Sequence, residues 1–117
     1  MIQSANLGFP RIGAKRELKK ALESYWRGES AVADLIATGK QLRAHNWQLQ
    51  KSSGIESISC GDFSFYDQVL DMTATLGAVP ARFDHSGDTV SLDTYFAMAR
   101  GTAKAPAMEM TKWVDTN

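Results

Sequence analysis

The sequence predicts an α/β fold in which about three short parallel strands alternate with helical crossovers. Four segments carry apolar residues at helical spacing, and short apolar runs bounded by glycine, proline or serine lie between and around them. The predicted order is strand, helix, helix, strand, helix, helix, strand. Strands that are joined by helices in this way are typical of a parallel sheet.

Length and composition agree with a single globular domain. The chain has 117 residues, of which 44% are hydrophobic and 22% are charged. No basic segment followed by an apolar run opens the chain, so we expect no secretory signal, and no stretch approaches the roughly 20 apolar residues of a membrane span. The single cysteine, Cys60, excludes an internal disulfide and favours a reducing, cytoplasmic setting. The neutral net charge gives no reason to expect nucleic acid as a partner.

The first strand is predicted at residues 4–8 and the first helix at residues 15–27. The apolar face of this helix consists of Leu18, Ala21, Leu22, Tyr25 and Trp26. Glu23 and Arg27 are spaced as an ion pair, and Gly28 is expected to end the helix. The two aromatic residues would also suit a stacking platform for a base or a pteridine, but their spacing favours the core.

A second helix is predicted from an N-cap at Ser30 to residue 51. Its apolar face consists of Val32, Leu35, Ile36, Leu42 and Leu49. The second strand is predicted at residues 55–59, and residues 60–62 then turn the chain.

The second half of the chain predicts two shorter helices and a third strand. Ser64 and Asp67 have the spacing of a capping box for a helix that ends near residue 76. Residues 78–91 form a loop, and Ser91 caps a helix that Gly101 ends. The third strand is predicted at residues 107–113. The expected inward residues are Tyr66, Val69, Leu70 and Thr73 in the first of these helices, and Leu92, Tyr95, Phe96 and Ala99 in the second.

Charged residues are distributed unevenly along the chain. Residues 1–28 carry six Lys or Arg and two Asp or Glu, whereas residues 29–117 carry seven and eleven. Lys15 and Arg16 fall in the first turn of the predicted helix, where the macrodipole favours anions. Free backbone N–H groups, nearby glycines and these cations predict a site for a polyanion. The alternative is a solvated face on which the cations only confer solubility.

Three segments are expected to converge at one edge of the sheet. Ligands of parallel sheets collect where the carboxyl ends of the strands meet the following loops. Residues 8–19, 60–62 and 112–117 all follow predicted strands. We therefore expect these three segments to lie close together.

The residue types exclude several familiar chemistries. No Ser/His/Asp or Cys/His arrangement has a local signature, so Cys60 is expected to be a buried or half-buried inert thiol rather than a nucleophile. His45 is expected on the surface, and His85 has no ligand partners at suitable spacing, so we expect no zinc site. The glycines at residues 8–13 lack the spacing of a Walker loop or a dinucleotide fingerprint.

A series of short motifs resembles the amino-terminal end of the cobalamin-independent methionine synthases. The motifs occur in order along nearly the whole chain: residues 7–13 (LGFPRIG), 16–20 (RELKK), 23–26 (ESYW), 61–63 (GDF), 66–70 (YDQVL), 77–82 (GAVPAR), 99–101 and 109–113 (EMTKW). Ser59 and Cys60, ahead of the GDF motif, depart from the commoner residues of the family.

The resemblance implies a fold and an activity. It implies that residues 1–117 are the opening part of the first (β/α)8 (TIM-like) barrel of a longer two-barrel enzyme, so the barrel is incomplete and the chain is an amino-terminal fragment. The family transfers a methyl group from 5-methyltetrahydropteroyltri-L-glutamate to homocysteine without cobalamin. A zinc ion held by the second barrel activates the thiolate, and its ligands have no counterparts here. The fragment alone is expected to be inactive and to self-associate through uncovered apolar surface.

The resemblance also implies a binding site for the folate polyglutamate tail. The family's contacts carry over to Arg16, Glu17, Leu18, Lys19 and Lys112, and Asn117 is a further candidate. Leu18 is expected to point to the apolar face, and Glu17 to contact backbone or orient a neighbouring cation. The alternative function is a stand-alone, non-catalytic α/β module that binds another polyanionic metabolite.

Overall fold

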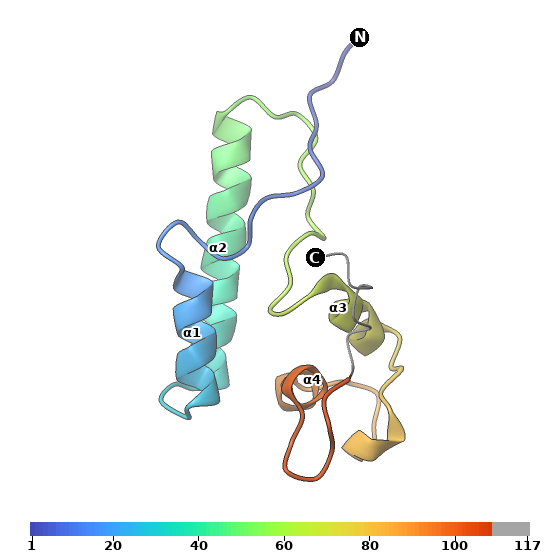
Figure 1. Cartoon of the computed structure of the whole chain (residues 1–117). Helices are drawn as coiled ribbons and strands as arrows, with labels where there is room; N and C mark the ends of the chain where they lie inside the picture. Colours follow the sequence, from blue (N-terminus) through green and yellow to red (C-terminus); the bar gives the residue numbers. More distant parts are fainter. Residues whose placement is uncertain (109–117) are drawn as a thin grey trace, which may run out of the picture. The chain divides into compact units, whose positions relative to one another are not determined.

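The computed structural model describes residues 1–108, which consist mainly of helices and loops (Figure 1). The helices are α1 (Glu17–Trp26), α2 (Val32–Ser52), α3 (Gln68–Thr75) and α4 (Leu92–Arg100), with a short 3-10 helix, η1, at Ala81–Phe83. All four predicted helices are therefore confirmed. The chain divides into two units, Met1–Phe65 and Tyr66–Asn117.

The predicted strands are not formed in the described part of the chain. Residues 4–8 and 55–59 meet only at one isolated parallel bridge, between Ala5 and Ser57. The backbone carbonyl of Ser4 accepts from the N–H groups of Glu56 and Ser57 at 3.2 and 3.0 Å. The bridge has the parallel direction that the prediction requires. It does not extend into strands because an isolated pair of short segments is marginally stable, and a parallel pair is weaker per residue than an antiparallel one. The third predicted strand, from residue 109 onward, lies outside the described residues.

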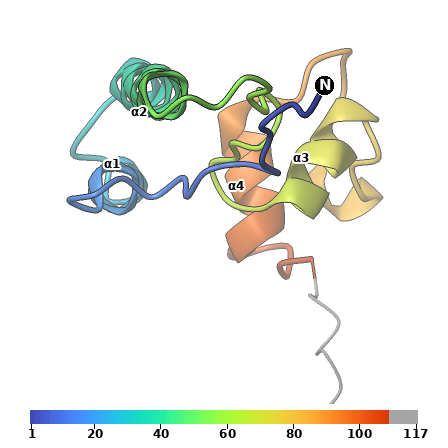
Figure 2. The ribbon, with the colours of Figure 1, turned by 90° about the horizontal axis from the view of Figure 1, so that it is seen from above.

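The unit at residues 1–65 is built on an antiparallel pair of helices. α1 and α2 lie side by side in both views (Figures 1 and 2). Their facing sides bury Leu18 and Leu22 of α1 against Leu35 and Leu42 of α2. The helices are antiparallel because only a short connection, residues 27–31, joins them.

The connection between α1 and α2 corrects two predictions about helix ends. Gly28 ends α1 as expected, with a φ of 73° and an N–H group that donates to the carbonyl of Tyr25 at 3.0 Å. The predicted ion pair between Arg27 and Glu23 is not formed. Arg27 instead donates two hydrogen bonds of 2.8 Å each to the Glu29 carboxylate. A fork of two bonds outcompetes a single contact along the helix. α2 begins after Ala31 rather than Ser30, and the Asp34 carboxylate accepts from the Ala31 N–H at 3.0 Å.

The buried face of α2 also differs from the prediction. Val32, Ile36 and Leu49 are exposed, whereas Leu35, Gly39, Leu42, Asn46 and Gln50 are buried. A Cβ on Gly39 would lie 2.8 Å from Cζ of Phe65 and 3.5 Å from Cε1 of Phe63, so this glycine lets both rings approach the helix. The segment that contains Phe63 and Phe65 therefore decides which face of α2 is buried.

The unit that begins at Tyr66 has its own core. α3 and α4 pack against each other, and the buried apolar residues are Leu70, Tyr95, Phe96, Met98 and Ala105. Ser91 caps α4 as predicted, since its Oγ accepts from the Thr94 N–H at 3.2 Å. The N-cap of α3 is Asp67, whose Oδ1 accepts from the Leu70 N–H at 2.7 Å, and not Ser64. Val69 was expected to face inward but is 75% exposed.

One polar network ties α3 to α4. The Tyr95 hydroxyl donates to Oδ1 of Asp71 at 2.5 Å and accepts from the backbone N–H of Tyr66 at 3.1 Å. Burial, followed by the hydrogen bond to Asp71, raises the pKa of the Tyr95 phenol above its ordinary value. The network therefore holds a neutral phenol against a carboxylate.

No helix within residues 1–108 combines the length and the apolar character needed to cross a membrane.

Candidate functional site

The predicted polyanion site lies at the start of α1, after a tight turn. The carbonyl of Gly13 accepts from the Arg16 N–H at 3.0 Å, and that of Ile12 accepts from the Leu18 N–H at 3.0 Å. Gly13 and Arg16 both have positive φ, at 87° and 61°. Two left-handed residues interrupt the helical path, so α1 begins at Glu17 and not at Lys15.

The side-chain carboxylate of Glu17 binds a backbone N–H group of this turn. Oε2 of Glu17 accepts from the Lys15 N–H at 3.0 Å. A hydrogen bond from its own backbone N–H is the largest cause that lowers the pKa of the Glu17 carboxyl, and the Lys15 amide and the charges of Lys20 and Lys15 act in the same direction. The prediction of free N–H groups at this helix start is therefore wrong for Lys15, Arg16 and Leu18. The Glu17 side chain therefore binds the chain's own backbone.

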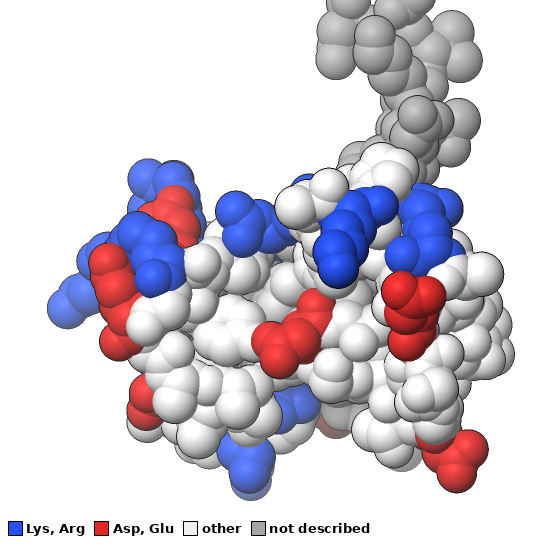
Figure 3. Space-filling view, turned by 90° about the horizontal axis from the view of Figure 1, so that it is seen from below, with Lys and Arg blue, Asp and Glu red and all other residues white. Residues whose placement is uncertain are grey.

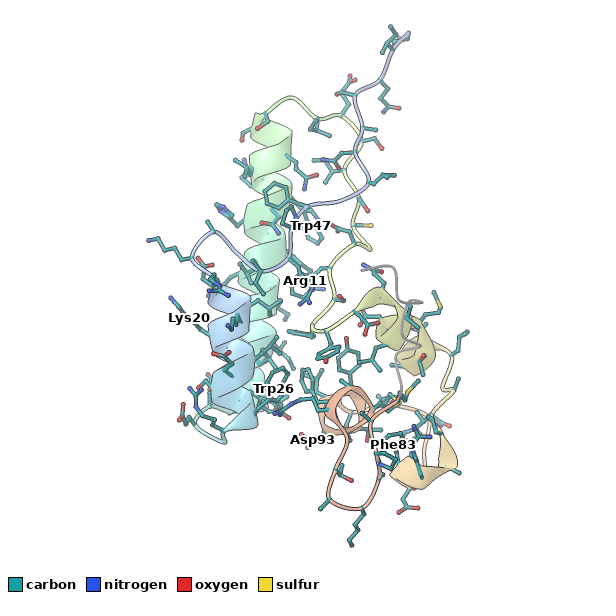
Figure 4. The ribbon with its side chains drawn as sticks, in the orientation of Figure 1. Arg11, Lys20, Trp26, Trp47, Phe83 and Asp93 are labelled. Carbon is teal, nitrogen blue, oxygen red and sulfur yellow. The ribbon has the colours of Figure 1, made fainter. Side chains whose placement is uncertain are left out.

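The cations of this segment remain at the surface. Lys15, Arg16, Lys19 and Lys20 are all exposed, and Figure 4 shows the Lys20 side chain pointing away from α1. Leu18 is fully buried, as expected, and anchors the helix between them. The Lys19 ammonium lies 3.6 Å from Oε1 of Glu23, and these side chains are 47% and 43% exposed. The groups available to bind an external anion at this turn are therefore the side-chain cations rather than the backbone N–H groups.

One face of the molecule carries charged side chains of both signs (Figure 3). Lysine and arginine side chains lie beside aspartate and glutamate side chains on the face shown in Figure 3.

The structure brings two of the three expected segments together. Oδ2 of Asp62 accepts from the Phe9 N–H at 2.8 Å, which joins residues 8–19 to residues 60–62. A Cβ on Gly8, whose φ is 154°, would lie 2.8 Å from Cβ of Asp62. Glycine is required for this close approach. Lys112 and Asn117, in the third segment, lie outside the described residues.

We expect the Asp62→Ala variant to lose about 1.5 kcal/mol of unfolding free energy, because the half-buried Phe9 N–H loses a charged acceptor. Denaturant unfolding of the full-length protein, with amide hydrogen exchange at Phe9, measures this loss. Asp62→Asn keeps an oxygen acceptor and should retain most of the stability. An equal loss in both variants would show that the carboxylate acts through something other than this hydrogen bond.

Residues that the sequence analysis did not single out hold the opening loop in place. Arg11 lies between α2 and the segment after residue 62 (Figure 4), and its Nη1 donates to the carbonyls of Phe65 at 3.3 Å and Ser64 at 3.5 Å. Asn46 donates to the carbonyl of Pro10 at 3.4 Å. Trp47, labelled on α2 in Figure 4, donates from its Nε1 to the carbonyl of Ser59 at 3.2 Å. No periodic pattern marks these residues, because each acts on a carbonyl that is distant in sequence.

The remaining candidates do not form a reactive site in the described part of the chain. Cys60 is a free, exposed thiol, so the expectation of a buried or half-buried position is wrong. His45 is exposed, as expected. Within residues 1–108 no group of three or more His, Cys, Asp or Glu side chains is placed to hold a metal ion.

Comparison with known proteins matches nearly the whole chain to one family. The family model described as "Cobalamin-independent synthase, N-terminal domain" matches residues 3–117. A relative from Nitrosomonas europaea, named 5-methyltetrahydropteroyltriglutamate–homocysteine methyltransferase, is 63% identical over 112 residues, which is 96% of this chain. Relatives of the same name from Aeromonas salmonicida and Listeria innocua are 58% and 54% identical, over 100% and 97% of the chain.

The match covers only a small part of each relative. The chain spans about 15% of the length of the Nitrosomonas europaea protein and a similar share of the others. The family model nevertheless covers all but the first two residues. The 63% identity to the Nitrosomonas europaea protein is well above the level that a shared fold requires. The chain therefore belongs to the cobalamin-independent synthase family, in the part that corresponds to the N-terminal domain of that family.

Proposed function

We propose that this chain forms part of a methyltransferase that makes methionine, by transfer of a methyl group from 5-methyltetrahydropteroyltriglutamate to homocysteine. The observation that carries the proposal is the match of residues 3–117 to the family, with relatives whose names state this reaction. In this proposal the chain acts within a longer polypeptide and is inactive by itself. Residues 4–8 and 55–59, which meet at the Ala5–Ser57 bridge, become neighbouring strands of a (β/α)8 barrel there.

The part of the reaction assigned to this chain is binding of the folate's glutamyl tail. A polyglutamyl tail is a flexible polyanion, and Arg16 and Lys19 present exposed cations beside the ordered turn at residues 13–16. Each cation donates charge-assisted hydrogen bonds to a tail carboxylate. Lys112 and Asn117 are proposed as further contacts. The tail thus holds the folate while the methyl group is transferred elsewhere in the enzyme.

The neighbours of these cations have supporting roles in the proposal. Glu17 keeps the turn closed through the Lys15 amide and does not receive the ligand through its side chain. Leu18, fully buried against the helix pair, fixes the rotation of α1 and so the positions of Arg16 and Lys19. The zinc ion of the family would supply an activated homocysteine thiolate from elsewhere in the longer polypeptide.

We expect Lys19→Ala, in the full-length enzyme, to raise the Michaelis constant for the triglutamate donor about two- to fivefold and to change that for a monoglutamate donor much less. An exposed ion pair contributes only ~0.2–1 kcal/mol, so fivefold is about the upper limit, and a twofold change corresponds to about 0.4 kcal/mol. The effect should shrink as salt screens the attraction. Steady-state kinetics with both donors at several ionic strengths measures it.

Lys40→Ala is the matched control, because it removes the same charge from an exposed position on α2. It should leave the ratio of the two Michaelis constants unchanged. Equal losses with both donors in Lys19→Ala, insensitive to salt, would show that Lys19 serves the fold and not the tail. Preference for an unrelated polyanion would instead support the stand-alone binding module.

A further inference from the structure

Glu23 occupies an unusual position for a residue beside an anion site. α1 carries two acids, Glu17 and Glu23, and the first is bound to the backbone of the turn. Glu23 is the one that reaches a candidate ligand-binding cation, with 3.6 Å between its Oε1 and the Lys19 ammonium. A glutamyl tail would present the same chemical group, a carboxylate, to the same ammonium.

The Lys19–Glu23 contact is too weak to serve as a support for Lys19. Charge-assisted N–H···O bonds are about 2.7–2.9 Å long, so 3.6 Å is a loose contact. Both side chains are close to half exposed, and solvent screens such pairs. The order also matters, because a lysine placed four residues before a glutamate is the less favourable arrangement on a helix.

From this geometry we propose that Glu23 is a specificity-determining residue that competes with the folate tail for Lys19. The inference rests on the proposed function of Lys19. In the free enzyme Glu23 partly neutralises the lysine, and the arriving tail carboxylate displaces Glu23 into solvent. A short tail that does not reach Lys19 is unaffected by this competition, whereas a longer tail must overcome it.

The test is the variant Glu23→Gln in the full-length enzyme, with the triglutamate and monoglutamate forms of 5-methyltetrahydrofolate as donors. Glutamine keeps the size of the side chain and removes its charge. We expect the Michaelis constant for the triglutamate donor to fall about two- to threefold and that for the monoglutamate donor to stay unchanged. The fall in the Michaelis constant should disappear when Lys19→Ala is already present, because the ammonium for which Glu23 and the tail compete is then missing.

Glu29→Gln is the matched control, because it removes the same charge from an exposed side chain just beyond the far end of α1 and leaves Glu23 beside Lys19. It should leave both Michaelis constants unchanged. An unchanged or raised Michaelis constant in Glu23→Gln, or a gain that persists without Lys19, overturns the inference while Lys19→Ala still discriminates between the donors. If Lys19→Ala does not discriminate between them, the proposed tail site itself is wrong, and the two failures are thereby distinguished.

Discussion

Replacement of Gly13 by alanine is expected to lower the unfolding free energy by about 3 kcal/mol and to disorder the start of α1. The φ of Gly13 is 87°, which an L-residue adopts only with strain. A Cβ there would also overlap Oε2 of Glu17 and lie 3.0 Å from Cδ2 of Leu42. The Glu17 carboxylate would have to leave the Lys15 N–H. Denaturant unfolding of the full-length protein, with amide hydrogen exchange over residues 13–20, measures both effects.

Gly54→Ala separates the two causes, since Gly54 has a φ of 86° but open space where a Cβ would lie. This control should cost only about 1–2 kcal/mol, the strain of a left-handed alanine. Adding Glu17→Ala to Gly13→Ala should bring no further loss, because the contact is already broken. Equal costs at Gly13 and Gly54 would contradict the assignment of Glu17 as the group that closes the turn.

Replacement of Tyr95 by phenylalanine is expected to lower the unfolding free energy by about 2 kcal/mol. The hydroxyl donates to the Asp71 carboxylate and accepts from the Tyr66 N–H. Both hydrogen bonds are lost when the hydroxyl is removed. Tyr66→Phe removes a hydroxyl outside this network and keeps the backbone N–H, so it should cost little. Denaturant unfolding of the full-length protein at neutral pH measures the difference between these variants.

The same residue predicts a dependence on alkaline pH. The pKa of Tyr95 is raised in the folded state, so folding requires the phenol to stay protonated. Its contribution to stability is complete below the unfolded-state pKa of about 10 and falls as the pH rises above that value. Tyr95→Phe should lack this part of the alkaline decline. An unchanged alkaline profile would contradict the buried neutral phenol.

The sequence by itself determined the helices and the family. Apolar spacing places four helices within a few residues of their observed bounds, because helical periodicity is a local property of the chain. Ser91 and Gly28 act as predicted because capping depends on neighbouring residues alone. A series of short motifs identified the family that the comparison confirms. Topological reasoning also predicted that residues 8–19 and 60–62 meet, as the Phe9–Asp62 hydrogen bond shows.

The tertiary structure decided which polar groups are paired and which helix faces are buried. α2 buries Gly39 and Asn46 in place of Ile36 and Leu49, because the ring of Phe65 and the carbonyl of Pro10 lie on that face. α1 starts at Glu17 because the left-handed Gly13 and Arg16 interrupt the helical path just before it. These outcomes depend on groups that are distant in sequence or on side-chain direction, and residue spacing carries no information about either. A polar group can be buried without a large cost only where it has a hydrogen-bond partner, and the complete fold supplies that partner.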